Sequence, residues 1–155
     1  MEQLVIHGGA GSLEGKTTEA QKMHDSLCKI WEETFEVLQK RSAEDAVRHA
    51  VRMLEDDPVY NAGTGSKLQA DGQIRMSAAL MDGTNNRFSG VINVQNIRNP
   101  IEAAALLSGE KHSILSSAQA TEFCRTKGIP EYNPETEFRL HEYKSSCAGI
   151  HGTVG

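Results

Sequence analysis

Residues 67 to 96 contain closely spaced segments with strand character, and helical patterns lie before and after them. The stretch KLQADGQIRMSAALMDG contains Asp71-Gly72, a dipeptide favoured in two-residue hairpin turns, between apolar residues that first alternate and then run on. The stretch RFSGVINVQN adds a further strand. Consecutive strands joined by a hairpin, with helices grouped on either side, predict antiparallel pairing in a layered α+β fold rather than a doubly wound parallel sheet.

Two helices are predicted before these strands. Residues 18 to 40 carry apolar side chains at helical spacing, which is typical of a long amphipathic helix. Ser42 followed by Asp45 resembles a capping box, and Pro58 forbids continuation of a helix that has begun there. The second helix is therefore predicted over about 42 to 56.

The remaining segments complete the predicted order β, α, α, β, β, β, α, α. QLVIH, residues 3 to 7, is predicted as a short strand that ends in a glycine turn. Pro100 opens one short helix, and Gly128 is placed as the C-cap of another. Residues 129 to 146 are polar and aperiodic, so a linker or mobile loop is predicted there, leading to a strand in CAGIHGTVG at the end.

Composition restricts the classes of function. A chain of 155 residues suits one domain, and a net charge of −5 without a cluster of Lys and Arg argues against a nucleic-acid surface. The opening MEQLVIHGGAG has neither a basic region nor a long apolar run, so we expect no signal peptide, no membrane span and a cytoplasmic protein. Three cysteines without C-x-x-C spacing suit reduced thiols.

Two patterns permit a functional and a purely structural interpretation. Gly9, Gly11 and Gly15 follow an apolar segment and could approach a dinucleotide, although the next helix begins too late for that fingerprint, and a tight turn is the simpler interpretation. His141, Cys147 and His151 lie close in sequence but match no structural zinc spacing, so solvated histidines are favoured over a metal site.

The loop LEDDPVYNAGTGS, residues 54 to 66, is more informative. A helix end, a proline and two glycines converge there on the polar Asn61. An ordinary turn after a helix explains the spacing. Such a loop can also direct several carbonyl oxygens inward, which is the environment that an alkali or alkaline-earth ion prefers, and Asn61 would then present its amide to a nearby pocket.

The Gly152-Thr153 pair has a further chemical possibility. A threonine that becomes an amino terminus has its own α-amine as a base for its hydroxyl, so one residue supplies both nucleophile and base. The same hydroxyl can create that terminus by attacking the carbonyl of Gly152 and forming an ester that water hydrolyses. Glycine on the acyl side tolerates the unusual backbone angles of such an attack.

Five motifs in order resemble one family over nearly the whole chain. VIHGGAG, LEDDPVYNAGTGS, LMDG, NPIEAA and GTVG are similar to the α-subunit of plant-type L-asparaginases, the isoaspartyl peptidases of the N-terminal-nucleophile hydrolases. The resemblance implies a four-layer αββα sandwich and a precursor that cuts itself between Gly152 and Thr153. It also implies an enzyme that hydrolyses L-asparagine and β-aspartyl dipeptides to aspartate.

The resemblance implies a role for individual residues. Thr153 is expected to be the nucleophile, Asn61 to assist the oxyanion, and Gly8 and Gly9 to form a turn beside the cleavage point. A structural sodium ion is expected on the backbone carbonyls of Leu54, Glu55, Asp57, Tyr60, Ala62 and Thr64. No cofactor for catalysis is implied. The expected partner is the β-subunit of the same precursor, in a dimer of αβ units that forms a heterotetramer.

The chain departs from the family pattern in two ways. Ser77 stands where family members usually have an aspartate. The residues that grip the substrate lie in the family's β-subunit, so residues 1 to 152 match the α-subunit and residues 153 to 155 only the start of the β-subunit. The leading hypothesis is thus half of a threonine hydrolase. The alternatives are an inactive truncated fragment or binding module, and a nucleotide-binding domain.

Overall fold

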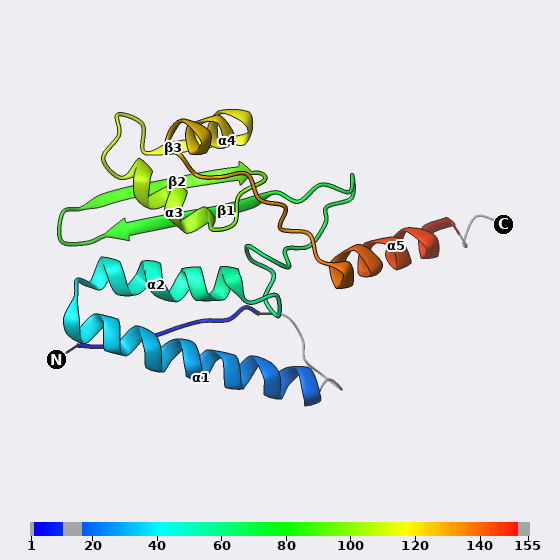
Figure 1. Cartoon of the computed structure of the whole chain (residues 1–155), viewed down its shortest axis with the longest axis horizontal. Helices are drawn as coiled ribbons and strands as arrows, with labels where there is room; N and C mark the ends of the chain where they lie inside the picture. Colours follow the sequence, from blue (N-terminus) through cyan, green and yellow to red (C-terminus); the bar gives the residue numbers. More distant parts are fainter. Residues whose placement is uncertain (1, 11–16, 152–155) are drawn as a thin grey trace.

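The computed structural model describes residues 2–10 and 17–151, with side chains described up to residue 147. This part of the chain forms helices and a small sheet, an α+β arrangement (Figure 1). In chain order the elements are α1 (Thr17–Lys40), α2 (Ala43–Asp56), β1 (Met76–Asp82), β2 (Arg87–Val94), α3 (Pro100–Leu107), β3 (Ile114–Ser116), α4 (Ser117–Thr126) and α5 (Glu137–His151).

The first two helices form a pair that lies beside the sheet (Figure 1). Ile30 of α1, Ala50 of α2 and Tyr60 after α2 form the centre of its apolar core. The predicted cap of α2 is confirmed, because the Ser42 hydroxyl oxygen accepts from the Asp45 backbone N–H at 3.1 Å. Amphipathic spacing and this cap account for both helices.

The sheet has three strands in the order β1-β2-β3. β1 and β2 pair antiparallel, as predicted, whereas β3 was not predicted and pairs parallel with β2. Helices α3 and α4 cover one face of this sheet. Both helices agree with the predictions, because Pro100 occupies the first turn of α3 and Gly128 adopts a φ of +80° just after α4.

A β-bulge interrupts the pairing of the first two strands. The register shifts between Met76 and Ala78, and Asn93 on the opposite strand has a φ of 54°. The Ser77 hydroxyl oxygen accepts from the Asn93 backbone N–H at 3.2 Å. Ser77, the position that departs from the family pattern, therefore satisfies the amide of the extra residue that a bulge leaves unpaired.

Two predicted strand features are wrong. Asp71-Gly72 does form a turn, with the Gly72 N–H donating to the Gln69 carbonyl at 2.8 Å, but no strand flanks the turn on its N-terminal side. The hairpin instead joins β1 to β2 through residues 83–86. Residues 3–7 also form no strand, because no described strand lies beside them to complete a ladder, and Val5 is 91% exposed.

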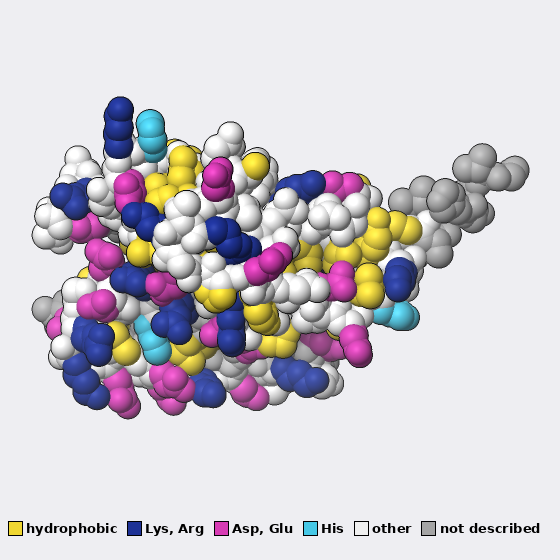
Figure 2. Space-filling model, turned by 45° about the horizontal axis from the view of Figure 1, so that its top comes forward, with side chains coloured by type: hydrophobic (Ala, Val, Ile, Leu, Met, Phe, Trp, Pro, Cys, Tyr) yellow, Lys and Arg dark blue, Asp and Glu magenta, His cyan; other side chains and the backbone are white. Residues whose placement is uncertain are grey.

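The predicted loop over residues 129–146 is wrong in its second half, because α5 begins at Glu137. This helix extends away from the other elements (Figure 1), and hydrophobic side chains gather in that direction (Figure 2). The buried Arg139 anchors its first turn by donating from Nε to the Gly65 carbonyl at 2.6 Å. The strand predicted in residues 147–155 is wrong as far as His151, which is still helical.

Among the described helices, none combines the length and the apolar character that a membrane span requires. Cys28, Cys124 and Cys147 are free thiols. Burial raises the pKa of the Cys124 thiol, which packs in the core between the sheet and α4.

Candidate active site

The loop after α2 is folded tightly back onto the end of that helix. Gly63 has a φ of +49°, and a β-carbon there would lie 2.2 Å from the Glu55 carbonyl oxygen. Gly65 has a φ of +90°, and a β-carbon there would lie 2.7 Å from the Pro58 carbonyl oxygen. The Thr64 N–H donates to the Glu55 carbonyl at 2.7 Å. Only glycine fits these two positions, so the sequence NAGTG fixes the path of the loop.

This loop presents Asn61 at the surface, beside a cavity. The Asn61 side-chain oxygen accepts from the Lys67 backbone N–H at 2.8 Å, which leaves its amide –NH₂ as a donor. The adjacent cavity has a volume of about 290 Å³ and lies between the loop, the start of β1 and Pro100. Its polar lining side chains are those of Glu55, Asn61, Ser66, Lys67, Gln69, Arg75 and Ser77. Asn61 thus presents an amide donor to a polar cavity, while its assistance to an oxyanion stays a prediction.

Glu55 lies buried below the loop and connects it to α3. One carboxyl oxygen accepts from the Ile101 backbone N–H at 3.0 Å, while the other is buried without a hydrogen-bond partner among the described residues. Desolvation raises the pKa of Glu55 to about 8, against the opposing effect of the Ile101 N–H. Burial thus favours the protonated, uncharged form of this carboxyl group.

A second bridge joins the end of α2 to the segment before α3. The Asp56 carboxylate accepts from Arg98 Nε at 2.7 Å and from the Asn99 amide at 3.0 Å. With the Glu55 bond, these contacts fix the loop relative to the sheet. Sequence reasoning missed them, since the partners are more than 40 residues apart along the chain.

The carbonyl groups predicted to hold sodium lie in this same loop. Glu55 and Asp57 already accept one backbone N–H each, whereas the carbonyls of Tyr60, Ala62 and Thr64 accept none in the described turns and loops. Leu54 cannot receive the usual helical bond because the fourth residue after it is Pro58, which has no N–H. Carbonyl oxygens without donors are the ligands that a hard cation takes, so the donor set fits the ion.

The structure brings the N-terminal glycine turn to this loop. A β-carbon on Gly8 would lie 3.0 Å from the Tyr60 ring and 3.2 Å from the Leu27 side chain. Gly9 has a φ of +121°, and its N–H donates to His7 Nδ1 at 3.2 Å. Close packing on Tyr60 explains the first glycine, and a left-handed backbone explains the second. A dinucleotide loop loses support, because no strand precedes these glycines.

The predicted cut site, Gly152 and Thr153, lies outside the described residues, as do Gly11 and Gly15 of the glycine pattern. His141 and Cys147 both lie on α5. In residues 2–10 and 17–147, no three His, Cys, Asp or Glu side chains are grouped so as to hold a metal ion.

Helix α5 adds contacts to the site that the sequence did not predict. Lys67, next to the cavity, pairs with Glu142 at 3.1 Å, and Arg139 binds the Gly65 carbonyl. The Tyr143 hydroxyl donates to the Ala70 carbonyl at 3.2 Å. The only signal in the sequence was the helix-forming composition of EFRLHEYK, which lacks an apolar stripe.

Comparison with known proteins agrees with this geometry. The model of the asparaginase family matches residues 1–149. An isoaspartyl peptidase/L-asparaginase of Synechocystis is 46% identical over 144 residues, covering 91% of this chain and 43% of that protein. One from Nostoc is 48% identical, covering 96% of this chain and 49% of that protein. A plant-type L-asparaginase of Pyrococcus horikoshii is 37% identical, covering 93% and 47%.

The chain spans about half the length of these curated relatives. The matched part includes the N-terminal glycine turn, the loop that carries Asn61 and the whole described sheet. The chain therefore belongs to the asparaginase family.

Proposed function

We propose that this chain is the leading half of an autoprocessing threonine hydrolase that converts L-asparagine and β-aspartyl dipeptides to aspartate. The observation that carries the proposal is the donor amide of Asn61, held at a polar cavity by a loop in which only glycine fits positions 63 and 65. The names of the relatives, isoaspartyl peptidase/L-asparaginase and plant-type L-asparaginase, indicate the substrates.

In the proposed reaction, the hydroxyl of Thr153 attacks the side-chain carbonyl carbon of the substrate while the Thr153 α-amine takes the hydroxyl proton. The Asn61 –NH₂ donates to the oxygen that becomes negative in the tetrahedral intermediate. That intermediate collapses as its C–N bond breaks, and the Thr153 α-amine returns the proton to the leaving nitrogen, which departs as ammonia from asparagine or as the amino group of the second amino acid from a β-aspartyl dipeptide. Water then hydrolyses the Thr153 ester, which releases aspartate and restores the hydroxyl.

The proposed maturation uses the same nucleophile within the chain. The Thr153 hydroxyl attacks the carbonyl of Gly152, the peptide bond breaks, and the nitrogen of Thr153 becomes a free α-amine. Water hydrolyses the resulting ester and leaves a carboxylate on Gly152. The Gly8–Gly9 turn, which packs on the loop that carries Asn61, is proposed to lie beside this junction.

The proposed fold of the mature protein is the four-layer αββα sandwich. One face of the sheet is covered by α3 and α4, while the other exposes Met81, Phe88, Ile92 and Ile114 by 58, 48, 45 and 49%. An apolar sheet face of this kind requires a further layer. We propose that a second sheet from the β-half covers it, within a dimer of αβ units located in the cytoplasm.

The proposal includes a structural sodium ion. The carbonyl oxygens of Leu54, Glu55, Asp57, Tyr60, Ala62 and Thr64 would hold it, and its charge would stabilise the end of α2, where the carbonyl groups of a helix carry partial negative charge. The ion takes no part in the chemical steps.

The test is the behaviour of Thr153→Ala in the full-length protein. Removing the hydroxyl should abolish both the cut at residue 152 and the release of ammonia from L-asparagine, measured by intact mass and a coupled assay. Thr18→Ala, on the exposed surface of α1, is the matched control and should behave as wild type. A variant at Thr153 that is still cut would refute the proposal. The alternative of an inactive fragment predicts no turnover by the 155-residue chain alone.

A further inference from the structure

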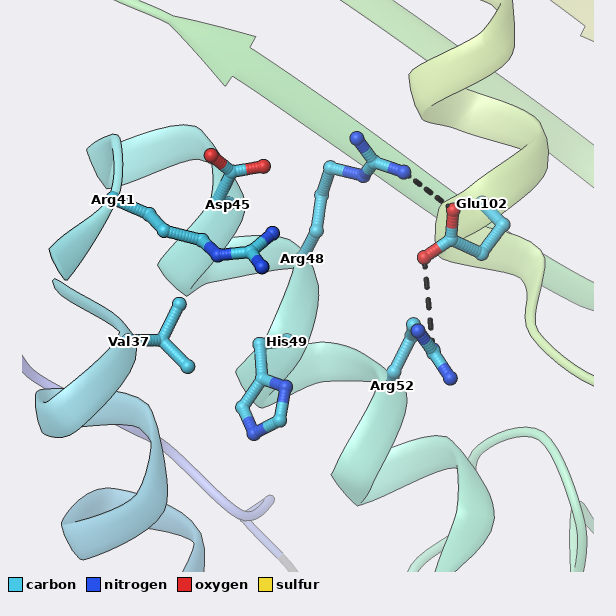
Figure 3. A pocket seen from close by; sticks show the side chains of 7 residues that line it. All are labelled: Val37, Arg41, Asp45, Arg48, His49, Arg52 and Glu102. Carbon is cyan, nitrogen blue, oxygen red and sulfur yellow. Dashed lines mark hydrogen bonds and ion pairs between the residues drawn. The ribbon is translucent and has the colours of Figure 1, made fainter.

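A second cavity of about 400 Å³ lies where α1, α2 and α3 meet (Figure 3). It is lined by Val37, Arg41, Asp45, Arg48, His49, Arg52 and Glu102 and shares no lining residue with the cavity beside Asn61. Its volume falls in the range of small-molecule sites. The proposed hydrolysis gives this cavity no role.

The two carboxylates of this cavity already have partners. Glu102 accepts from Arg48 Nη2 at 2.6 Å and lies 3.7 Å from Arg52 Nε, as the dashed lines in Figure 3 show. Asp45 accepts from the Ser42 hydroxyl at 2.8 Å, and this bond is the main reason why its pKa is lowered. The cavity thus holds three guanidinium groups and two carboxylates, of which Glu102 pairs with Arg48 and Arg52 and Asp45 bonds with Ser42 outside the lining.

Several polar atoms of the same cavity have no partner. Arg48 Nε, an N–H donor, and His49 Nε2, which donates or accepts according to its tautomer, are buried without a hydrogen-bond partner among the described residues. Arg41 makes no ion pair or side-chain hydrogen bond with any residue that the structure describes, and in Figure 3 its guanidinium group points toward the stem of Arg48. Buried donors without acceptors are unfavourable, so a ligand that carries several acceptor oxygens and negative charge would complement this arrangement.

We propose that this cavity binds a small oxyanion, through either a phosphate or a carboxylate group. Arginine binds both groups because its planar fork of N–H donors matches their oxygens. Arg41 and Arg48 would supply the charge, and His49 would supply a further donor from below. The inference stands on these residues alone and does not depend on the asparaginase activity.

The test is a titration of the full-length protein at constant ionic strength. Calorimetry and thermal unfolding with sodium phosphate, sodium succinate and sodium L-aspartate are compared with sodium chloride. We expect saturable binding and a raised Tm for at least one oxyanion. Phosphate alone binding would identify a phosphate site, and binding of succinate and aspartate would identify a carboxylate site. An oxyanion effect no larger than that of chloride would overturn the proposal.

Arg41→Gln tests whether binding occurs in this cavity. Arg41 is exposed and pairs with no described residue, so the variant should fold normally and bind the oxyanion about tenfold more weakly. Lys40→Gln is the matched control. It removes the same charge at the neighbouring residue, whose side chain pairs with Glu36 and does not line the cavity. Equal weakening in both variants, or none in Arg41→Gln, would overturn the site. Aspartate bound at the hydrolytic centre would be unaffected by Arg41→Gln.

Discussion

The two faces of the sheet carry similar residues in different environments. On the covered face, Leu80 and Val91 are 4% and 0% exposed and pack among the helices. On the other face, Met81 and Ile92, their immediate neighbours along the strands, are 58% and 45% exposed. The first face completes a core by itself, whereas the second presents apolar surface together with Ser77, which lines the cavity of Asn61. Stability is therefore concentrated on one face, and the proposed assembly and chemistry use the other.

The largest expected effect is that of a charge on the open face. In the full-length protein, Phe88→Asp should prevent the β-half from packing on the sheet, since a buried carboxylate without a partner is strongly unfavourable. We expect loss of the assembled species by size-exclusion chromatography and loss of asparaginase activity. Arg87→Asp, on the neighbouring exposed residue, should retain both. Wild-type assembly of Phe88→Asp would show that this face stays in water.

The next prediction compares how much stability is lost when a side chain is truncated on each face of the sheet. Leu80→Ala should lower the free energy of unfolding of the 155-residue chain by about 2–5 kcal/mol, because it leaves a cavity in the core. Met81→Ala, next to it on the open face, should cost less than about 0.5 kcal/mol. Urea unfolding followed by circular dichroism measures both. Equal costs would mean that the open face is already buried in this chain.

The chemistry on the open side is tested by Asn61→Ala. Removing one oxyanion donor should lower kcat of the mature enzyme by about a hundredfold or more, about 2.7 kcal/mol, with little change in folding. Asn85→Ala, in the exposed turn between β1 and β2, provides the control. An unchanged kcat for Asn61→Ala would mean that Asn61 has only a structural role, through its hydrogen bond with the Lys67 backbone N–H.

The last prediction concerns the pH dependence of stability. The folded-state pKa of Glu55, about 8, lies above the ordinary value of 4.5, so the folded protein retains a proton that the unfolded chain has released. This contribution is complete below pH 4.5 and is lost as pH rises through 8. Glu55→Gln should therefore make Tm decline less between pH 5.5 and 8.5 than it does in the wild type. Each kcal/mol of pH-dependent stability that the substitution removes corresponds to roughly 2–4 °C in Tm. Glu32→Gln, exposed on α1, should leave the slope unchanged; the same slope in Glu55→Gln would contradict the assignment.

Local signals predicted the helices well and the sheet less well. Ser42, Pro58 and Pro100 act within a few residues of their position, so the bounds of α2 and α3 could be derived from sequence. The Asp71 side chain instead binds Gln73 N–H and Arg75, which makes a turn without strand pairing. A hairpin signal specifies a turn, but the ladder depends on partners that only the folded chain supplies.

The site divides in the same way. Asn61 and the glycines around it were predicted because their requirements are local. Two other contacts were not predicted, because they join residues far apart in the chain. The Glu55 bond to Ile101 spans 46 positions, and the Arg139 bond to Gly65 spans 74. Helix α5 was missed for this reason, because its fixed points are tertiary contacts and its sequence has no apolar stripe.

The packing of Gly63 and Gly65 has a consequence for sequence variation. Both positions combine a left-handed backbone with no room for a β-carbon, so in a saturation library every other genetically encoded residue at 63 or 65 should disappear under selection for a folded chain. Thr64, between them, is held by its side chain instead, because its hydroxyl bonds with the Tyr132 hydroxyl at 2.9 Å. Two positions of the loop thus exclude any β-carbon, whereas the position between them should select for a side chain that keeps this hydrogen bond.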